Sequence, residues 1–140
     1  MPITPNLTQT LQRVVNRDEE LAARFPQLGL AVHTAVTTGQ PFDAPREALH
    51  RAVARNLRLH ADLDTRVAAR PNDIPPAAAA LADAVAAQHR ALSAFLDELM
   101  RAGTGLDAVA VTRTLQALLT LHRDLEHRLL GALREPTPAR

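Results

Sequence analysis

The segment LQALLTLHRDLEHRLLGAL, residues 115–133, limits most strongly what this chain can fold into. Its leucines recur at intervals of three and four residues, which is the spacing of one face of an α-helix. Two polar residues, His122 and Glu126, interrupt this apolar face, and they are neighbours because they lie one helical turn apart. A carboxylate on a buried helix face is costly unless it has a partner. A metal ion is one such partner, because His and Glu at this spacing can chelate it.

Three further segments show the same apolar periodicity, and short stretches rich in Gly and Pro separate them. The predicted helices cover about residues 7–38 with a kink at Pro26, 45–70, 76–102 and 106–134. No segment has the alternating pattern of a strand. We therefore predict a single all-α domain over residues 1–140, folded as an up-down-up-down four-helix bundle with a metal site in its core.

Polar residues interrupt the apolar face of every predicted helix. They are Asp18, His60, Asp64, His89, His122 and Glu126. Counted from the middle of each connection, they lie at similar heights in the bundle, with mismatches of roughly 5–6 Å. We therefore predict one interior layer of three imidazoles and three carboxylates, which suits iron or manganese and could take zinc. Two divalent ions are electrostatically reasonable there if a hydroxide bridges them.

The contribution of the first helix rests on the same count of heights. His33 would lie about 16 Å from the level of His60, whereas Asp18 lies close to it. We therefore predict Asp18 as the ligand from this helix, with Glu19 and Glu20 as alternatives.

Three segments, LRLHADLDTRVAARP, AAQHRALSAFLDEL and LTLHRDLEHRLLGAL, resemble the hemerythrin-like, HHE cation-binding domain family. The family pattern is a His on the first helix, His-x-x-x-Glu on the second, His on the third and His-x-x-x-Glu on the fourth. The residues that match the last three helices are His60, Asp64, His89, His122 and Glu126. Asp64 is one methylene shorter than the usual Glu. The segment NRDEELAARFPQL resembles the family's first helix, with Asp18 at the position of the family's His.

This resemblance implies a dinuclear non-haem iron centre, for which manganese or zinc would be substitutes. It also implies that the chain binds a small diatomic ligand or peroxide, in O2, peroxide or NO chemistry or sensing, or in iron handling. An anionic Asp18 in place of a neutral His should lower the reduction potential. We therefore expect peroxide or O2 reduction, or iron sensing, in preference to reversible O2 carriage. Ser93 lies four residues after His89, where some family members have a further ligand, and its small side chain could leave room for an exogenous one.

Two other classes of protein fit parts of the sequence. In a haem-binding globin, His60 and His89 would be the distal and proximal histidines, since they are 29 residues apart. That reading leaves Asp64 and Glu126 buried without a role. The second alternative is a metal-free helical interaction bundle whose site has decayed.

The composition excludes several kinds of site and partner. With no Cys and no Tyr, the chain has no disulfide, no thiolate ligand and no tyrosyl ligand. All 16 basic residues are Arg and are interspersed with acidic ones, so we expect no nucleic-acid partner. No apolar run approaches the length of a membrane span, and the start MPITPNLTQT lacks a signal-peptide pattern. We therefore expect no membrane association and a cytoplasmic location.

Overall fold

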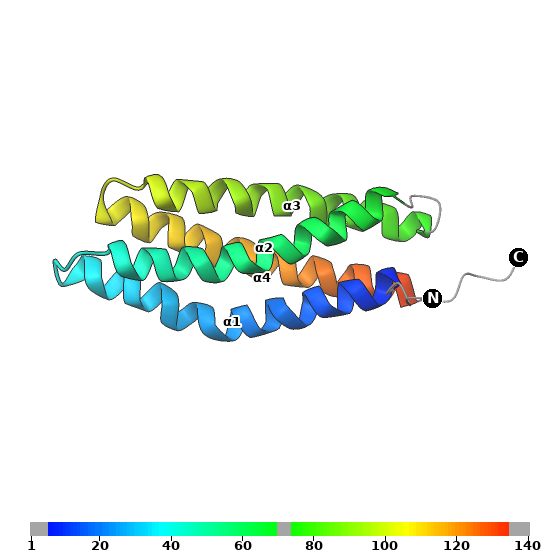
Figure 1. The fold of residues 1–140 in the computed structure, drawn as a ribbon, viewed down its shortest axis with the longest axis horizontal. Helices are drawn as coiled ribbons and strands as arrows, with labels where there is room; N and C mark the ends of the chain where they lie inside the picture. The colour runs from blue at the N-terminus through cyan, green and yellow to red at the C-terminus, as the bar shows by residue number, and fades with distance from the viewer. Residues whose placement is uncertain (1–5, 70–73, 135–140) are drawn as a thin grey trace, which may run out of the picture.

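The computed structural model describes residues 6–69 and 74–134, which form four helices and contain no strand (Figure 1). The helices are α1 (Leu7–Thr37), α2 (Asp43–Ala69), α3 (Pro76–Arg101) and α4 (Gly105–Arg134). Each helix packs mainly against two others, in the cyclic order α1, α2, α3, α4, and successive helices run in opposite directions (Figure 1). The prediction of an all-α four-helix bundle is therefore confirmed for the described residues. The predicted end of the second helix at residue 70 and residues 71–73 of the following break lie outside them.

Local sequence signals explain where the helices start and bend. Asn6 caps α1, because its side chain accepts from the backbone N–H of Gln9 and the Gln9 side chain accepts from the Asn6 backbone N–H. Pro76 opens α3, where a missing N–H costs nothing. Helix α1 continues through Pro26, and its ribbon bends in its middle part (Figure 1). Proline removes one backbone hydrogen bond there.

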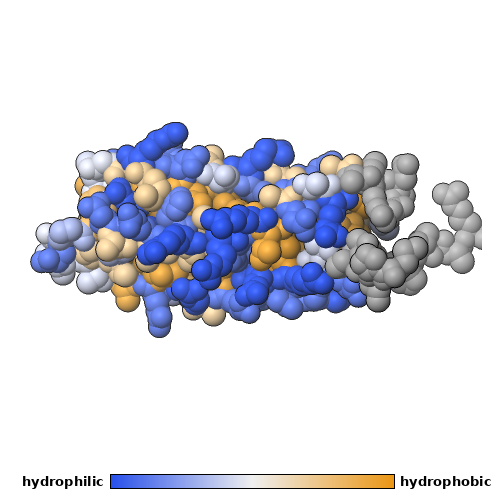
Figure 2. Space-filling model, viewed as in Figure 1, coloured by the Kyte–Doolittle hydropathy of each residue, from blue (hydrophilic) through white to orange (hydrophobic). Residues whose placement is uncertain are grey.

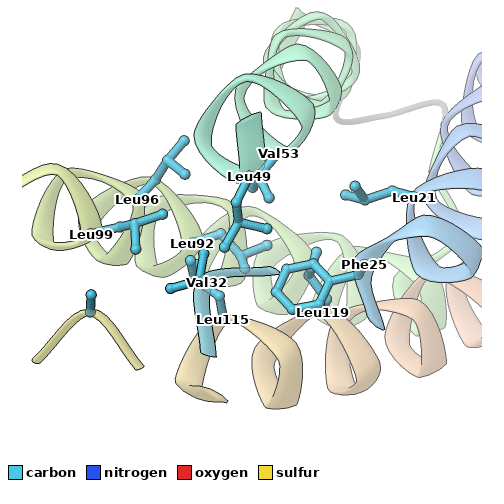
Figure 3. Close-up of a cluster of buried hydrophobic side chains, with 11 residues drawn as sticks. Leu21, Phe25, Val32, Leu49, Val53, Leu92, Leu96, Leu99, Leu115 and Leu119 are labelled. Carbon is cyan, nitrogen blue, oxygen red and sulfur yellow. The ribbon is translucent and has the colours of Figure 1, made fainter. Parts of the chain in front are cut away.

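The apolar core is divided into two clusters, one towards each end of the bundle. The turn-side cluster lies towards the α1–α2 loop and the α3–α4 turn, and Figure 3 shows its side chains pointing together from all four helices. It contains Leu21, Phe25, Val32, Leu49, Val53, Leu92, Leu96, Leu99, Ala108, Leu115 and Leu119. The terminus-side cluster lies towards the other end. It contains Leu11, Val14, Val15, Leu63, Ile74, Ala78, Ala82, Val85, Leu129 and Leu130.

The face shown in Figure 2 is mostly hydrophilic, with hydrophobic side chains visible between the polar ones. In the described parts of the chain, no helix combines the length and the apolar character that crossing a bilayer requires.

Candidate metal centre

A layer of buried polar side chains separates the two apolar clusters. It contains Asp18 (2% exposed), His60 (1%), His89 (6%), His122 (0%) and Glu126 (0%). On every helix these residues lie in sequence between members of the two clusters, which explains why they share one depth. The prediction that these five side chains are buried is confirmed.

The three imidazole rings of this layer lie against one another. The ring centroids of His60 and His89 are 4.3 Å apart, those of His60 and His122 are 4.9 Å apart, and those of His89 and His122 are 4.7 Å apart. The Nε2 atoms of His89 and His122 approach to 3.1 Å. Three histidines from three different helices therefore meet at one point inside the bundle.

The Glu126 carboxylate completes this group. Its Oε2 atom lies 3.3 Å from His122 Nε2 and 3.8 Å from His60 Nε2. One ligand atom from each of His60, His89, His122 and Glu126 lies within 4.8 Å of all the others. This buried group could therefore hold a metal ion.

Two features of the group fit a cation. Ligand atoms bound to one ion at 2.0–2.2 Å are about 2.9–3.5 Å apart, and the His89–His122 and His122–Glu126 separations of 3.1 and 3.3 Å fall in that range. In addition, both carboxylate oxygens of Glu126 are buried and form no hydrogen bond with any of the described residues. A buried oxygen of this kind costs free energy unless a cation or a proton compensates it.

Asp18 forms the wall of the layer on the α1 side. His60 Nε2 lies 3.0 Å from its Oδ1 and 2.9 Å from its Oδ2, and His122 Nε2 lies 3.7 Å from Oδ2. The Asn56 side chain donates to Oδ1 at 3.1 Å and also to the backbone carbonyl of Arg17 at 3.0 Å. Asp18 therefore borders the group of four, and Asn56 holds its orientation. A ligand role for Asp18 stays a prediction.

The structure puts the two predicted alternatives to Asp18 outside the layer. The carboxylate of Glu19 accepts from Arg123 and contacts His127 on the surface between α1 and α4. Glu20 is exposed and pairs with Arg17. Neither carboxylate enters the polar layer.

Asp64 lies behind the layer instead of inside it. Its Oδ2 atom accepts from His89 Nδ1 at 2.6 Å, and the Asp64 side chain is 32% exposed. A carboxylate on the outer nitrogen of a histidine orients the ring and makes the inner nitrogen more basic. In this structure the Asp64 carboxylate contacts His89 and no other member of the layer. A direct ligand role for Asp64 stays a prediction. Ser93, which was predicted to leave room beside the centre, is exposed on α3.

Sequence reasoning missed two residues that position the layer. Gln88 accepts from His122 Nδ1 at 3.0 Å, which turns the Nε2 atom of His122 towards the interior. Asn56 precedes His60 by one helical turn, and this spacing could have identified it as a buried residue on the same face. Gln88 carries no comparable signal, because it is adjacent to His89 and points to a different helix.

The two carboxyl groups that face each other in the layer titrate very differently. Burial, reinforced by the neighbouring Asp18 carboxylate, raises the pKa of Glu126 to about 11. Burial also acts to raise the pKa of Asp18, but contacts with His60 and Glu126 outweigh it and lower that pKa to about 2. Burial and the other imidazoles lower the pKa of His122 to about 3, and burial also lowers the pKa of His89. In the metal-free protein at neutral pH, the layer therefore holds an ionised Asp18, a protonated Glu126 and neutral imidazoles at His89 and His122.

Comparison of the chain with protein-family models, with curated proteins and with solved structures finds no match. The hemerythrin-like resemblance therefore rests on the sequence motifs alone.

Proposed function

We propose that this chain is a hemerythrin-like metal-binding protein that holds non-haem iron in its central polar layer. Its role would lie in O2, peroxide or NO chemistry or sensing, or in iron handling. The observation that carries the proposal is the convergence of four buried residues, His60, His89, His122 and Glu126, each with one ligand atom within 4.8 Å of all the others.

The chemistry of the donor atoms is compatible with iron. The group offers three imidazole nitrogens and a carboxylate oxygen, with a second carboxylate at Asp18, and contains no thiolate. Imidazole and carboxylate ligands suit iron, manganese and zinc, so a geometric fit alone leaves manganese and zinc as substitutes. One ion accounts for the four converging ligands. A second iron would need the Asp64 carboxylate, which accepts from His89 in this structure.

Bound iron would supply the one-electron chemistry with O2, NO or peroxide that no side chain of this protein offers. The surrounding residues set its environment. Apolar clusters on both sides of the layer exclude water. With iron bound, ionised Asp18 and Glu126 would place negative charge next to it and stabilise the ferric state. This would favour O2 or peroxide reduction or iron sensing over reversible O2 carriage.

The arrangement of the histidines argues against the haem alternative. The rings of His60 and His89 stack at 4.3 Å with an interplanar angle of 16°, so a porphyrin has no room between them. The haem reading also leaves the unpartnered Glu126 carboxylate unexplained.

Metal analysis and an optical spectrum test the proposal. We expect the protein loaded with Fe(II) without oxygen, then desalted and exposed to air, to retain one or two irons per chain. It should show near-ultraviolet ferric bands and no Soret band. His122→Ala should lose the iron, whereas Arg90→Gln, an exposed change on α3, should keep it. If the unsubstituted protein retains no iron, or if both variants retain the same amount, the metal-free interaction bundle would be the better explanation.

A further inference from the structure

A groove of about 640 Å³ runs along the surface between α1 and α2. Five arginines line it, namely Arg17, Arg24, Arg51, Arg55 and Arg58, together with a single acidic residue, Glu20. The arginines come from two facing helices, where they recur at helical spacing: seven residues apart on α1, and four and three apart on α2. The groove therefore concentrates positive charge on a chain whose net charge is only +1.

Most of this charge is not compensated within the described protein. Arg17 pairs with Glu20 at 3.3 Å, and both side chains are more than half exposed. Arg24, Arg51, Arg55 and Arg58 form no salt bridge with any described carboxylate, although Arg66, Arg123 and Arg128 elsewhere do. Like charges gathered without counter-charges repel one another, and a bound anion removes that repulsion.

The less exposed side chains that line the groove, which we call its floor, are mainly apolar. They include Leu21, Leu28 and Ala52, together with the polar Asn56. The volume is that of a small-molecule site, for which about 300–1,000 Å³ is typical. An apolar floor beneath a rim of guanidinium groups is suited to a compact organic anion.

The excess of four positive charges, five arginines against one glutamate, indicates which anion fits. A single carboxylate would neutralise only one arginine. A phosphoryl group carries about −1.5 to −2 at neutral pH and accepts paired hydrogen bonds from guanidinium groups. Two or three phosphoryl groups would match the charge of the groove.

We propose that the α1–α2 groove binds a small organic molecule that carries two or three phosphoryl groups. The groove also adjoins the polar layer, because Asn56 lines it and donates to Asp18 at 3.1 Å. The proposal does not depend on metal binding, so its test uses chelator-treated, metal-free protein. Its failure and the failure of the iron proposal are therefore separate results.

Isothermal titration calorimetry tests the proposal, with adenosine triphosphate as the organic probe and inorganic tripolyphosphate as the matched inorganic probe. We expect both probes to bind, and the organic triphosphate to bind more tightly because its body covers the apolar floor. The double variant Arg51→Gln/Arg55→Gln should weaken binding at least tenfold. The control Arg90→Gln/Arg101→Gln removes the same charge from exposed positions on α3 and should leave binding unchanged.

Three results would overturn the proposal. Equal weakening in both double variants would mean that the net charge of the protein attracts the probes without a site. Binding of inorganic tripolyphosphate as tight as that of the organic probe would remove the role of the apolar floor. The third result is that both small probes fail to bind, whereas duplex DNA or vesicles with anionic phospholipid bind through Arg51 and Arg55. The groove would then be a surface for a macromolecule or a membrane. Circular dichroism of both double variants confirms that they are folded.

Discussion

The polar layer and the two apolar clusters beside it are built on the same four helices, yet they contribute to the protein in opposite ways. The clusters bury leucines and valines, which stabilises the fold directly. The layer buries Asp18, Glu126 and three histidines, and within the described part of the chain it leaves His60 Nδ1 and both Glu126 oxygens without hydrogen bonds. Burial of the two apolar clusters stabilises the bundle, whereas the polar layer is suited to bind a metal ion. Four predictions test this division, ordered from the largest expected effect to the smallest.

Replacing Glu126 should abolish stabilisation by metal without harming the metal-free fold. Glu126 is protonated when metal is absent, because burial raises its pKa to about 11, so Glu126→Gln keeps both its shape and its neutrality. A metal ion at a thousand times its dissociation constant raises the free energy of unfolding of the unsubstituted protein by about 4 kcal/mol. We expect the variant to lose this gain, as measured by thermal unfolding with and without Fe(II). Glu98→Gln, an exposed change on α3, is the control. Equal stabilisation of both variants by metal would remove Glu126 from the site.

Truncating a leucine in either apolar cluster should destabilise the fold without changing metal binding. Leu99 in the turn-side cluster and Leu11 in the terminus-side cluster are both 0% exposed. Leu99→Ala and Leu11→Ala should each lower the free energy of unfolding by about 3 kcal/mol, with or without metal, because each leaves a cavity. Iron content at full loading should not change. The control Leu106→Ala alters a side chain that is 81% exposed and should have little effect. Loss of iron from the folded Leu variants would mean that the clusters and the layer cannot be separated.

A methyl group at residue 105 should disturb the contact between the start of α4 and the end of α1. A Cβ atom at this position would lie 2.6 Å from Cγ1 and 3.0 Å from Cγ2 of Val36, which is too close at both branches. Gly105→Ala should therefore lower the free energy of unfolding by about 1–2 kcal/mol through overpacking. Gly103→Ala is a matched control, because a Cβ there meets nothing within 4 Å. Urea denaturation of the two variants measures the difference, and equal stability would show that α4 shifts freely away from α1.

The smallest effect should come from Glu19, which follows Asp18 in sequence but faces solvent. Contacts with His127 and then with Arg123 lower the pKa of Glu19 from its usual 4.5. Its contribution to stability is therefore complete above pH 4.5 and disappears as the pH falls through the lowered pKa. Glu19→Gln should cost about 0.5 kcal/mol at pH 7, as exposed ion pairs do, and less once the pH falls below 4.5.

Denaturation of Glu19→Gln at pH 7 and pH 3 measures this change, with the exposed Glu47→Gln as the control. A difference between Glu19→Gln and the unsubstituted protein that grows on acidification would contradict the assigned sign.

The sequence predicted the fold and the depth of the layer because both follow from periodicity. A helix of 3.6 residues per turn fixes which residues share a face. His60, His89, His122 and Glu126 interrupt apolar faces, so they had to point inward, and the structure buries all four. The prediction that Asp18 shares this layer follows from the number of residues that separate it and His60 from the α1–α2 loop.

Periodicity could not predict what the side chains do once they reach the interior. Asp64 lies on the predicted face of α2, but its carboxylate meets the outer nitrogen of His89 on α3. That contact depends on a side-chain rotamer and on the rotation of two helices about their axes. The hydrogen bond that Gln88 accepts from His122 depends on the same rotation of the helices.

The arginines of the groove illustrate the same limit on the surface. The sequence places Arg51, Arg55 and Arg58 on one face of a helix with no acidic residue between them, but it does not show that Arg17 and Arg24 of α1 face them. The packing of α1 against α2 brings two rows together, with Arg17 and Arg24 on one side and Arg51, Arg55 and Arg58 on the other.

By itself, the sequence determined that four helices form and that polar groups enter their shared core, since each helix carries its own pattern of faces. Only the tertiary structure decided which nitrogen of each histidine faces inward, which carboxylate stays outside and which arginines meet. The physical reason is that these contacts join different helices. Their geometry depends on the axial rotation and separation that packing of the two apolar clusters imposes, and no pattern within a single helix contains that information.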